Sequence, residues 1–310
     1  MTVNVLFAAN PSDWDDYAGR LPGACRALGV EIDLSRDHAP ETVDYIVLAP
    51  NGPVRDFTPY TRAKAVLNLW AGVEAVVGNT TLTQPLCRMV DPGMTEGMVE
   101  WVTGHVLRHH LGIDGHVLRQ DGIWREKAPP LARHRRVGML GLGELGTACA
   151  RALAALNFDV AGWSRRKKTL PGIATHHGAD GLDAVLARSD ILVLLVPLTA
   201  ETEGLMNAAR IARLPEGAVI VNPGRGPLID DDALIAALDA GRLSHATLDV
   251  FRVEPLPPEH PFWAHPRVTV TPHIASATRP ETAAGVIAEN IRRGEAGEPF
   301  LHLVDRGAGY

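Results

Sequence analysis

Three segments in the last third of the chain carry polar residues of the types that handle protons and carboxylates. Arg225 lies in VNPGRGPLIDDDAL, Asp249 and Glu254 lie in LDVFRVEPLPP, and His273 lies in VTVTPHIAS. In each segment the polar residue follows an apolar run that has the character of a buried strand. We therefore expect these side chains beyond the carboxyl ends of sheet strands, which is where ligands bind in open α/β sheets.

These residue types suit the reduction of a ketone by a nicotinamide. A histidine donates a proton to the developing alkoxide near neutral pH. A carboxylate keeps such a histidine protonated and oriented, and an arginine grips an α-carboxylate with two N–H bonds and polarises the carbonyl. The alternatives are a surface loop for Arg225, a turn cap for Glu254 and a structural hydrogen bond for His273, because sequence distance alone does not show that the three converge.

A glycine-rich loop follows the strand predicted at RRVGML. In GLGELG, Gly141 permits the tight turn, Gly143 lets the backbone approach a pyrophosphate, and Gly146 lets the next helix pack close to the strand. The start of that helix then offers free N–H groups to the phosphates. The order strand, loop, helix, strand predicts a dinucleotide site; the alternative is a turn without a ligand. The other residues of this expected cofactor loop are Leu142, Glu144 and Leu145.

A run of positive charge, AGWSRRKK at 161–168, ends the second strand of this pattern. NAD-binding folds usually place an acidic residue here for the ribose 2′-hydroxyl. Ser164, Arg165 and Arg166 instead offer a hydroxyl and two guanidinium groups, which suit the 2′-phosphate of NADP. Lys167 and Lys168 are weaker candidates. The alternative is a solvated basic loop.

The composition of the whole chain excludes several protein classes. It has 310 residues, is 46% hydrophobic and 21% charged, and carries a net charge of −6, so nothing global indicates nucleic acid or an anionic membrane as partner. Three widely spaced cysteines predict neither a disulfide framework nor a metal site. The N-terminus lacks the features of a signal peptide, and the longest apolar run, ILVLLVPL, is less than half a membrane span. We expect a cytoplasmic protein.

The elements that must position these residues alternate between strands and helices. Before residue 100, strands are predicted at 3–9, 44–50 and 65–70 and helices at 12–28 and 59–66, and a long helix is predicted from about 95 to 120. Later apolar runs, from RRVGML to RVTVTP, predict a doubly wound parallel sheet. We expect an α/β protein with a smaller, flavodoxin-like substrate-binding domain (1–100 with 276–310) and an NADP-binding Rossmann domain (101–275).

The glycine loop and the three polar segments together match a known protein family. The chain resembles the D-isomer-specific 2-hydroxyacid dehydrogenases in GLGELG, NPGRGPLIDDDAL, DVFRVEPLP and TPHIAS. Within that family it is most similar to the glyoxylate/hydroxypyruvate reductase A branch, through AGVEAV, WSRRKK and PLPPEHPFWAHPRVTVTPHIA. It departs from the wider family at Glu74, where an aspartate is usual, and in lacking the acidic residue near WSRRKK.

The resemblance implies roles for residues. Arg225 would bind the substrate carboxylate and carbonyl, His273 would donate the proton, and Glu254 would pair with it. Asp249 would hydrogen-bond the nicotinamide carboxamide. The backbone amides that would help to hold the substrate are those of Ala71, Gly72 and Val73. The cofactor site is also expected to include Pro197 and Asn222.

The resemblance also implies an activity, with NADPH as cofactor and a homodimer as assembly. The expected reaction is reduction of a small 2-oxo acid, glyoxylate to glycolate or hydroxypyruvate to D-glycerate, with no metal. One alternative is a dehydrogenase of the same family that acts on a bulkier 2-oxo acid. Another is a nucleotide-sensing binding protein, which the complete set of arginine, glutamate and histidine argues against.

Overall fold

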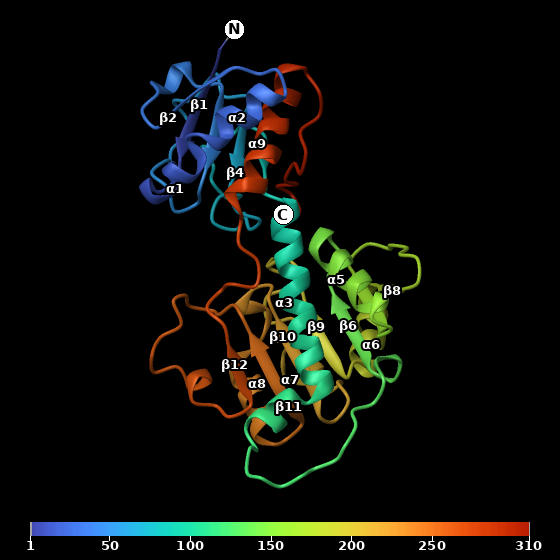
Figure 1. Cartoon of the computed structure of the whole chain (residues 1–310). Coiled ribbons are helices and arrows are strands. Elements are labelled where there is room, and N and C mark those ends of the chain that lie inside the picture. Colours follow the sequence, from blue (N-terminus) through green and yellow to red (C-terminus); the bar gives the residue numbers. More distant parts are fainter. Residues whose placement is uncertain (1, 310) are drawn as a thin grey trace. The chain divides into compact units, whose positions relative to one another are not determined.

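A computed structural model describes residues 2–309 of the chain (Figure 1). The chain divides into two compact units: unit 1 is Met1–Met94 with Ala277–Tyr310, and unit 2 is Thr95–Ser276. Each unit has its own parallel sheet. The α/β fold class expected from the sequence is therefore confirmed.

Unit 1 is built on five parallel strands in the order β2-β1-β3-β4-β5, which is the flavodoxin-like order. The strands are β1 (Val3–Ala8), β2 (Ile32–Ser35), β3 (Tyr45–Leu48), β4 (Ala65–Asn68) and β5 (Leu86–Cys87). The helices are α1 (Pro11–Tyr17), α2 (Arg20–Ala27), α9 (Pro280–Glu295) and a short 3-10 helix at Pro40–Thr42. Although α9 comes from the far end of the chain, it packs against α2 (Figure 1).

Two sequence expectations for unit 1 were wrong in detail. The helix expected at 12–28 is two helices, α1 and α2, which are separated at Ala18 and Gly19. The helix expected at 59–66 is not formed, because turns lie at 58–59 and 61–62 and β4 begins at Ala65. Every residue of β4 is buried, and β4 pairs with β3 on one side and β5 on the other. Burial in the sheet outweighs the helical tendency of the alanines there.

Unit 2 is built on seven parallel strands in the order β12-β11-β10-β9-β6-β7-β8. The strands are β6 (Arg136–Leu140), β7 (Asp159–Ser164), β8 (Ala174–His177), β9 (Ile191–Leu194), β10 (Ala218–Asn222), β11 (Leu243–Leu248) and β12 (Val268–Val270). The order reverses between β6 and β9. In a doubly wound sheet this switch point is where a dinucleotide binds.

The α-helices of this part of the chain are α3 (Pro92–Leu111), α4 (Ile113–Val117), α5 (Glu144–Ala155), α6 (Gly178–Arg188), α7 (Ala208–Ile211) and α8 (Asp231–Asp239). Short 3-10 helices lie at Ala132–His134, Gly226–Leu228 and Pro261–Trp263. The long helix expected at 95–120 is thus α3 and α4, divided at Gly112, whose φ of 66° is the left-handed conformation that ends helices.

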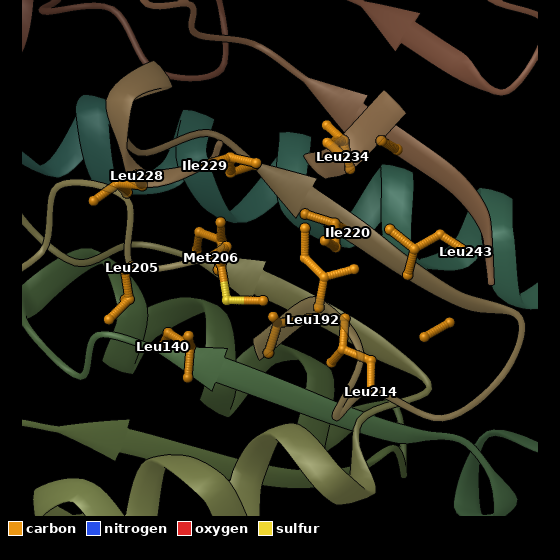
Figure 2. Packing of buried hydrophobic residues seen from close by; sticks show 14 of the residues in the cluster. Leu140, Leu192, Leu205, Met206, Leu214, Ile220, Leu228, Ile229, Leu234 and Leu243 are labelled. Carbon is orange, nitrogen blue, oxygen red and sulfur yellow. The ribbon is translucent and has the colours of Figure 1, made fainter. Parts of the chain in front are cut away.

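Apolar side chains cover both faces of the unit 2 sheet. On one face, Leu140, Leu192 and Ile220 from three strands pack with Leu234 of α8 (Figure 2). On the other face lie strand residues adjacent in sequence to these, such as Met139 of β6 beside Leu140. They pack with α3 and α5. Side chains alternate between the faces of a strand, so both sides of these strands are buried. Each buried Leu or Ile contributes about 1.5–3 kcal/mol, which makes the sheet a firm support for the loops at its edge.

Two half-buried histidines lie where α3 meets this sheet. The rings of His109 on α3 and His245 on β11 lie 5.0 Å apart. Their Nε2 atoms lie 2.8 Å from Thr247 Oγ1 and 2.8 Å from Thr269 Oγ1, respectively. Burial lowers the pKa of His109 to about 3 and that of His245 to about 4, and other positive groups, Arg108 among them, add to the shift.

These histidines predict that the protein loses stability in mild acid. In the unfolded chain they take up protons below about pH 6.5, whereas in the fold they stay neutral to about pH 4. Because the unfolded state then binds more protons, the free energy of unfolding falls as the pH falls through this window, by at most about 1.4 kcal/mol per pH unit for each histidine. Urea unfolding at about pH 7 and about pH 5 measures this. A smaller pH dependence is expected for His109→Gln; an unchanged one would contradict the account.

Candidate active site

The three candidate catalytic residues follow three adjacent strands of unit 2. Arg225 comes after β10, Glu254 after β11 and His273 after β12, and these strands are neighbours in the sheet. Because all three strands are parallel, their carboxyl ends meet at one edge. The apolar runs ahead of the three segments therefore bring the loops to a common edge.

Glu254 and His273 are in direct contact. Glu254 Oε2 lies 2.6 Å from His273 Nδ1. An ionised carboxylate accepts but does not donate hydrogen bonds, so Nδ1 carries the proton and Nε2 is the ring nitrogen left for another molecule. The other carboxylate oxygen, Oε1, accepts from the backbone N–H of Phe251 at 2.8 Å. The Phe251 amide therefore orients Glu254, and Glu254 orients the His273 ring. The His273 side chain is 49% exposed, so another molecule can reach it.

Arg225 lies in a loop that its neighbours fold tightly. The buried Asn222 donates through Nδ2 to the Arg225 carbonyl at 2.9 Å and accepts through Oδ1 from Gly224 N at 3.1 Å. A Cβ at Gly226 would lie 2.0 Å from the carbonyl carbon of Phe251, so only glycine fits there. This close approach holds the loop of Arg225 against the segment that leads to Glu254. Asn222, expected in the cofactor site, shapes the arginine loop in this structure.

Asp249 is fully buried at the end of β11. Its Oδ1 accepts from Thr271 Oγ1 at 2.6 Å and from Ile274 N at 2.9 Å, and its Oδ2 accepts from Ala275 N at 2.8 Å. Its carbonyl accepts from His273 N at 2.8 Å. The resemblance assigns Asp249 to the nicotinamide carboxamide; in this structure its carboxylate accepts from the loop that carries His273.

The glycine loop joins β6 to α5 at the switch point. Gly141 has a φ of 104°, and a Cβ there would lie 2.4 Å from the Leu195 carbonyl oxygen. A Cβ at Gly146 would lie 1.9 Å from the Gly141 carbonyl oxygen. In contrast, a Cβ at Gly143 meets nothing within 4 Å. The fold itself requires the first and third glycines, whereas the second leaves open space at the start of α5, as a bound pyrophosphate needs.

The other loop residues differ in exposure. Leu142 is buried, Glu144 is exposed as the first residue of α5, and Leu145 is half-buried. Pro197, after β9, is half-buried, and its carbonyl accepts from Thr202 Oγ1 at 2.6 Å.

The basic stretch begins at the end of β7, next to β6 in the sheet. Ser164 is buried and donates through Oγ to the Arg166 carbonyl at 2.7 Å. The Arg165 and Arg166 side chains are exposed, and Arg165 Nη1 lies 3.6 Å from Glu201 Oε2. Lys168 donates to the Leu142 carbonyl, which places its ammonium on the glycine loop. The sequence ranks Lys168 below the arginines. Its contact with Leu142, 26 positions away, depends on the pairing of β6 with β7 and has no local signal.

In unit 1, a loop with unpaired backbone donors follows β4. Ala71 and Gly72 are half-buried and Val73 is buried. Within the described chain the backbone N–H groups of these three residues donate to no protein acceptor, so they are available to an anion. Asn68, which the sequence analysis did not single out, shapes this loop: its Nδ2 donates to the Trp70 carbonyl at 2.8 Å and the Gly72 carbonyl at 3.0 Å.

Among residues 2–309, no group of three or more His, Cys, Asp or Glu side chains is placed to hold a metal ion. None of the helices described there combines the length and apolar character needed to cross a membrane.

Comparison with known proteins identifies relatives over the whole length of the chain. The family model described as "D-isomer specific 2-hydroxyacid dehydrogenase, NAD binding domain" matches residues 104–275. Glyoxylate/hydroxypyruvate reductase A of Serratia proteamaculans is 41% identical in an alignment of 257 positions that covers 80% of this chain and 82% of that protein.

Solved structures agree with this match. A D-isomer specific 2-hydroxyacid dehydrogenase from Xanthobacter autotrophicus Py2, in complex with NADPH and MES, has a TM-score of 0.93 and 43% identity over 100% of both chains. An NADPH-dependent glyoxylate/hydroxypyruvate reductase from Sinorhizobium meliloti, in complex with NADP and sulfate, has a TM-score of 0.87 and 37% identity over 100% of this chain and 99% of that chain. The chain belongs to the D-isomer specific 2-hydroxyacid dehydrogenase family.

Proposed function

We propose that this protein reduces small 2-oxo acids with NADPH, converting glyoxylate to glycolate and hydroxypyruvate to D-glycerate. The observation that carries the proposal is the 2.6 Å contact between Glu254 Oε2 and His273 Nδ1 at the edge of the unit 2 sheet. Relatives that bear the name glyoxylate/hydroxypyruvate reductase A support the substrate class.

The chain's own residues divide the work of the reaction. When bound, NADPH supplies the hydride that adds to the carbonyl carbon. The imidazolium form of His273, which carries a proton on Nε2 as well as on Nδ1, gives the Nε2 proton to the carbonyl oxygen, so ketone, hydride and proton together make the alcohol. Glu254 holds the ring through Nδ1 during this transfer. Arg225 binds the substrate carboxylate with a forked pair of N–H bonds, and the free amides of residues 71–73 add further donors.

Residues of unit 2 fit the cofactor. The open space at Gly143 and the start of α5 receive the pyrophosphate. The exposed guanidinium groups of Arg165 and Arg166 bind the 2′-phosphate, together with the Ser164 hydroxyl when its proton turns from the Arg166 carbonyl to the phosphate. The relatives from Xanthobacter autotrophicus and Sinorhizobium meliloti are complexes with NADPH and NADP, which supports this choice. Unit 2 is accordingly proposed as the nucleotide domain and unit 1 as the substrate domain.

Loss of the two guanidinium groups is expected to weaken the binding of NADPH and to leave the binding of NADH almost unchanged. In Arg165→Ala/Arg166→Ala the KM for NADPH should rise about 10- to 100-fold, because charge-assisted bonds to the 2′-phosphate are lost. The KM for NADH, which lacks that phosphate, should hardly change. Arg133→Ala, which removes an exposed charge elsewhere in unit 2, is the matched control. Equal losses with both nucleotides would indicate that the basic stretch is a solvated loop.

The activity is tested by following the oxidation of NADPH and NADH with glyoxylate, hydroxypyruvate and phenylpyruvate. Fast oxidation of NADPH with the two small acids supports the proposal. A preference for phenylpyruvate would indicate a bulkier physiological substrate. No oxidation with any acid would contradict the proposal and favour a nucleotide-binding protein without this activity.

We also propose a homodimer that forms through the segment 117–131 of unit 2. This segment exposes apolar side chains to a degree unusual for a monomer: Trp124 is 90% exposed and Leu118 is 81% exposed, and Val117, Ile123 and Leu131 are exposed too. Association of two copies would bury them. Light scattering should give twice the chain mass of 33.3 kDa. A single-chain mass at micromolar concentration would contradict this.

The cellular compartment proposed is the cytoplasm. The three cysteines, Cys25, Cys87 and Cys149, are buried thiols without disulfide partners, as is typical of proteins from a reducing compartment.

A further inference from the structure

The loop after β4 carries three consecutive backbone N–H groups, those of Ala71, Gly72 and Val73, that no acceptor among the described residues takes. Backbone N–H groups bind an anion when their peptides hold them facing outward. In a trans peptide the carbonyl and the N–H point in opposite directions, and the peptides of this loop are trans. The groups that hold the carbonyls of the loop therefore decide where its N–H groups point.

One side chain holds two of these carbonyls. Asn68 Nδ2 donates to the Trp70 carbonyl at 2.8 Å and to the Gly72 carbonyl at 3.0 Å. The Trp70 carbonyl shares a peptide with the Ala71 N–H, and the Gly72 carbonyl shares a peptide with the Val73 N–H. Both N–H groups therefore point away from the Asn68 amide. The peptide that carries the Gly72 N–H lies between these two fixed peptides.

Asn68 is itself held by the sheet of unit 1. It is the last residue of β4, it pairs with Leu48 of β3, and its relative exposure is 1%. Two carbonyl oxygens face Nδ2, so this atom must be the amide nitrogen, because only the nitrogen of the side-chain amide donates. Oδ1 is buried and accepts from no described residue. The hydrogen bonds that this side chain makes within the described chain therefore all go to the loop.

We propose that Asn68 is a positioning residue for the 2-oxo acid: its amide turns the N–H groups of residues 71–73 outward, where they meet the carboxylate of the substrate. The inference rests on the proposed function, because it names the residue that prepares these donors for that substrate. The donors are in place before the acid binds, so binding does not have to order the loop. Asn68 does not touch the acid through Nδ2, since the loop uses both of its hydrogens.

Asn68→Leu tests this by keeping the size of the side chain and removing both donors. The probe is oxamate, a carboxylate beside an amide carbonyl, which the enzyme does not reduce. Calorimetry on the NADPH-loaded protein should show the Kd for oxamate rising about tenfold, because charge-assisted bonds are weakened. The KM for glyoxylate should rise by a similar factor, while kcat changes by less than about threefold. A merely structural defect would lower the fraction of active protein, and so kcat, but not KM.

The matched control is Asn4→Leu. Asn4 also donates through Nδ2 to a backbone carbonyl, that of Thr42 at 3.0 Å. It lies near the start of β1, whereas the loop follows the end of β4, so the two lie at opposite ends of a parallel sheet. The Kd for oxamate and the KM for glyoxylate should not change in this control. Equal losses of oxamate affinity in the two variants, or an unchanged Kd in Asn68→Leu, would overturn the proposal.

A measurement on the wild-type protein covers the case in which Asn68→Leu does not fold. On addition of oxamate, the backbone amide NMR resonances of residues 71–73 and the side-chain NH2 resonances of Asn68 should shift together, because linked hydrogen bonds polarise one another. The NH2 resonances of Asn4 should stay in place. In a protein that reduces glyoxylate, the absence of shifts at 71–73 or at Asn68 would overturn the proposal and leave the proposed function standing. If these shifts occur but no 2-oxo acid is reduced, the proposed function alone is refuted.

Discussion

Replacing His273 by alanine is expected to lower kcat by about 10²- to 10⁴-fold, the usual contribution of a positioned general acid. The side chain is half-exposed and contacts Glu254, so its removal leaves no buried cavity and one unpaired carboxylate that water can reach. The fold should therefore be retained. Steady-state assay with NADPH and hydroxypyruvate measures the loss.

The control for this variant separates catalysis from binding. The Kd for NADPH should be unchanged in His273→Ala, since the glycine loop and basic stretch lie on other strands. His116→Ala, which removes an exposed histidine of α4, should keep full activity. A loss of NADPH affinity equal to the loss of turnover would show that His273 is not the proton donor.

For Arg225→Ala we expect both kinetic constants to change. The KM for the 2-oxo acid should rise about 10- to 100-fold, because charge-assisted bonds to the substrate carboxylate are lost. The kcat should also fall, by at least about tenfold, because a carboxylate without its partner leaves the carbonyl misplaced.

Arg225→Lys refines this test. Lysine keeps the charge but not the planar fork, so it should recover part of the KM and little of kcat. The Asn222 bonds that shape the loop involve backbone groups of Gly224 and Arg225, and they remain in both variants. A KM at the wild-type value in Arg225→Ala would show that another group binds the carboxylate.

The sequence predicts the central strands well, but it does not predict the edge strands β5 and β8. β9 and β10 are buried on both faces and appear as unbroken apolar runs. β8, with the sequence ATHH, lies at an edge, has no buried residue and gives no apolar signal. β5 has only two residues. β5 and β8 form because the neighbouring strands β4 and β7 offer them hydrogen bonds, and their local sequence does not encode this pairing.

For the site, the sequence predicts which residues follow which strands, because apolar runs and glycine spacing are local features. The hydrogen bond between Glu254 and His273, which lie 19 positions apart, depends on the neighbouring places of β11 and β12 in the sheet. The same holds for the bonds between the Asp249 carboxylate and the loop 271–275, and for the contact of Lys168 with the glycine loop. These are tertiary contacts, and they refine roles that motifs assign only by resemblance.

The central claim is that this protein transfers hydride from NADPH to the carbonyl carbon of a small 2-oxo acid. The most direct test is incubation with hydroxypyruvate and NADPH deuterated at the transferring position, followed by mass spectrometry and chiral analysis of the product. The account predicts D-glycerate with one deuterium on C2. Glycerate without deuterium, the opposite configuration, or no glycerate at all would contradict it.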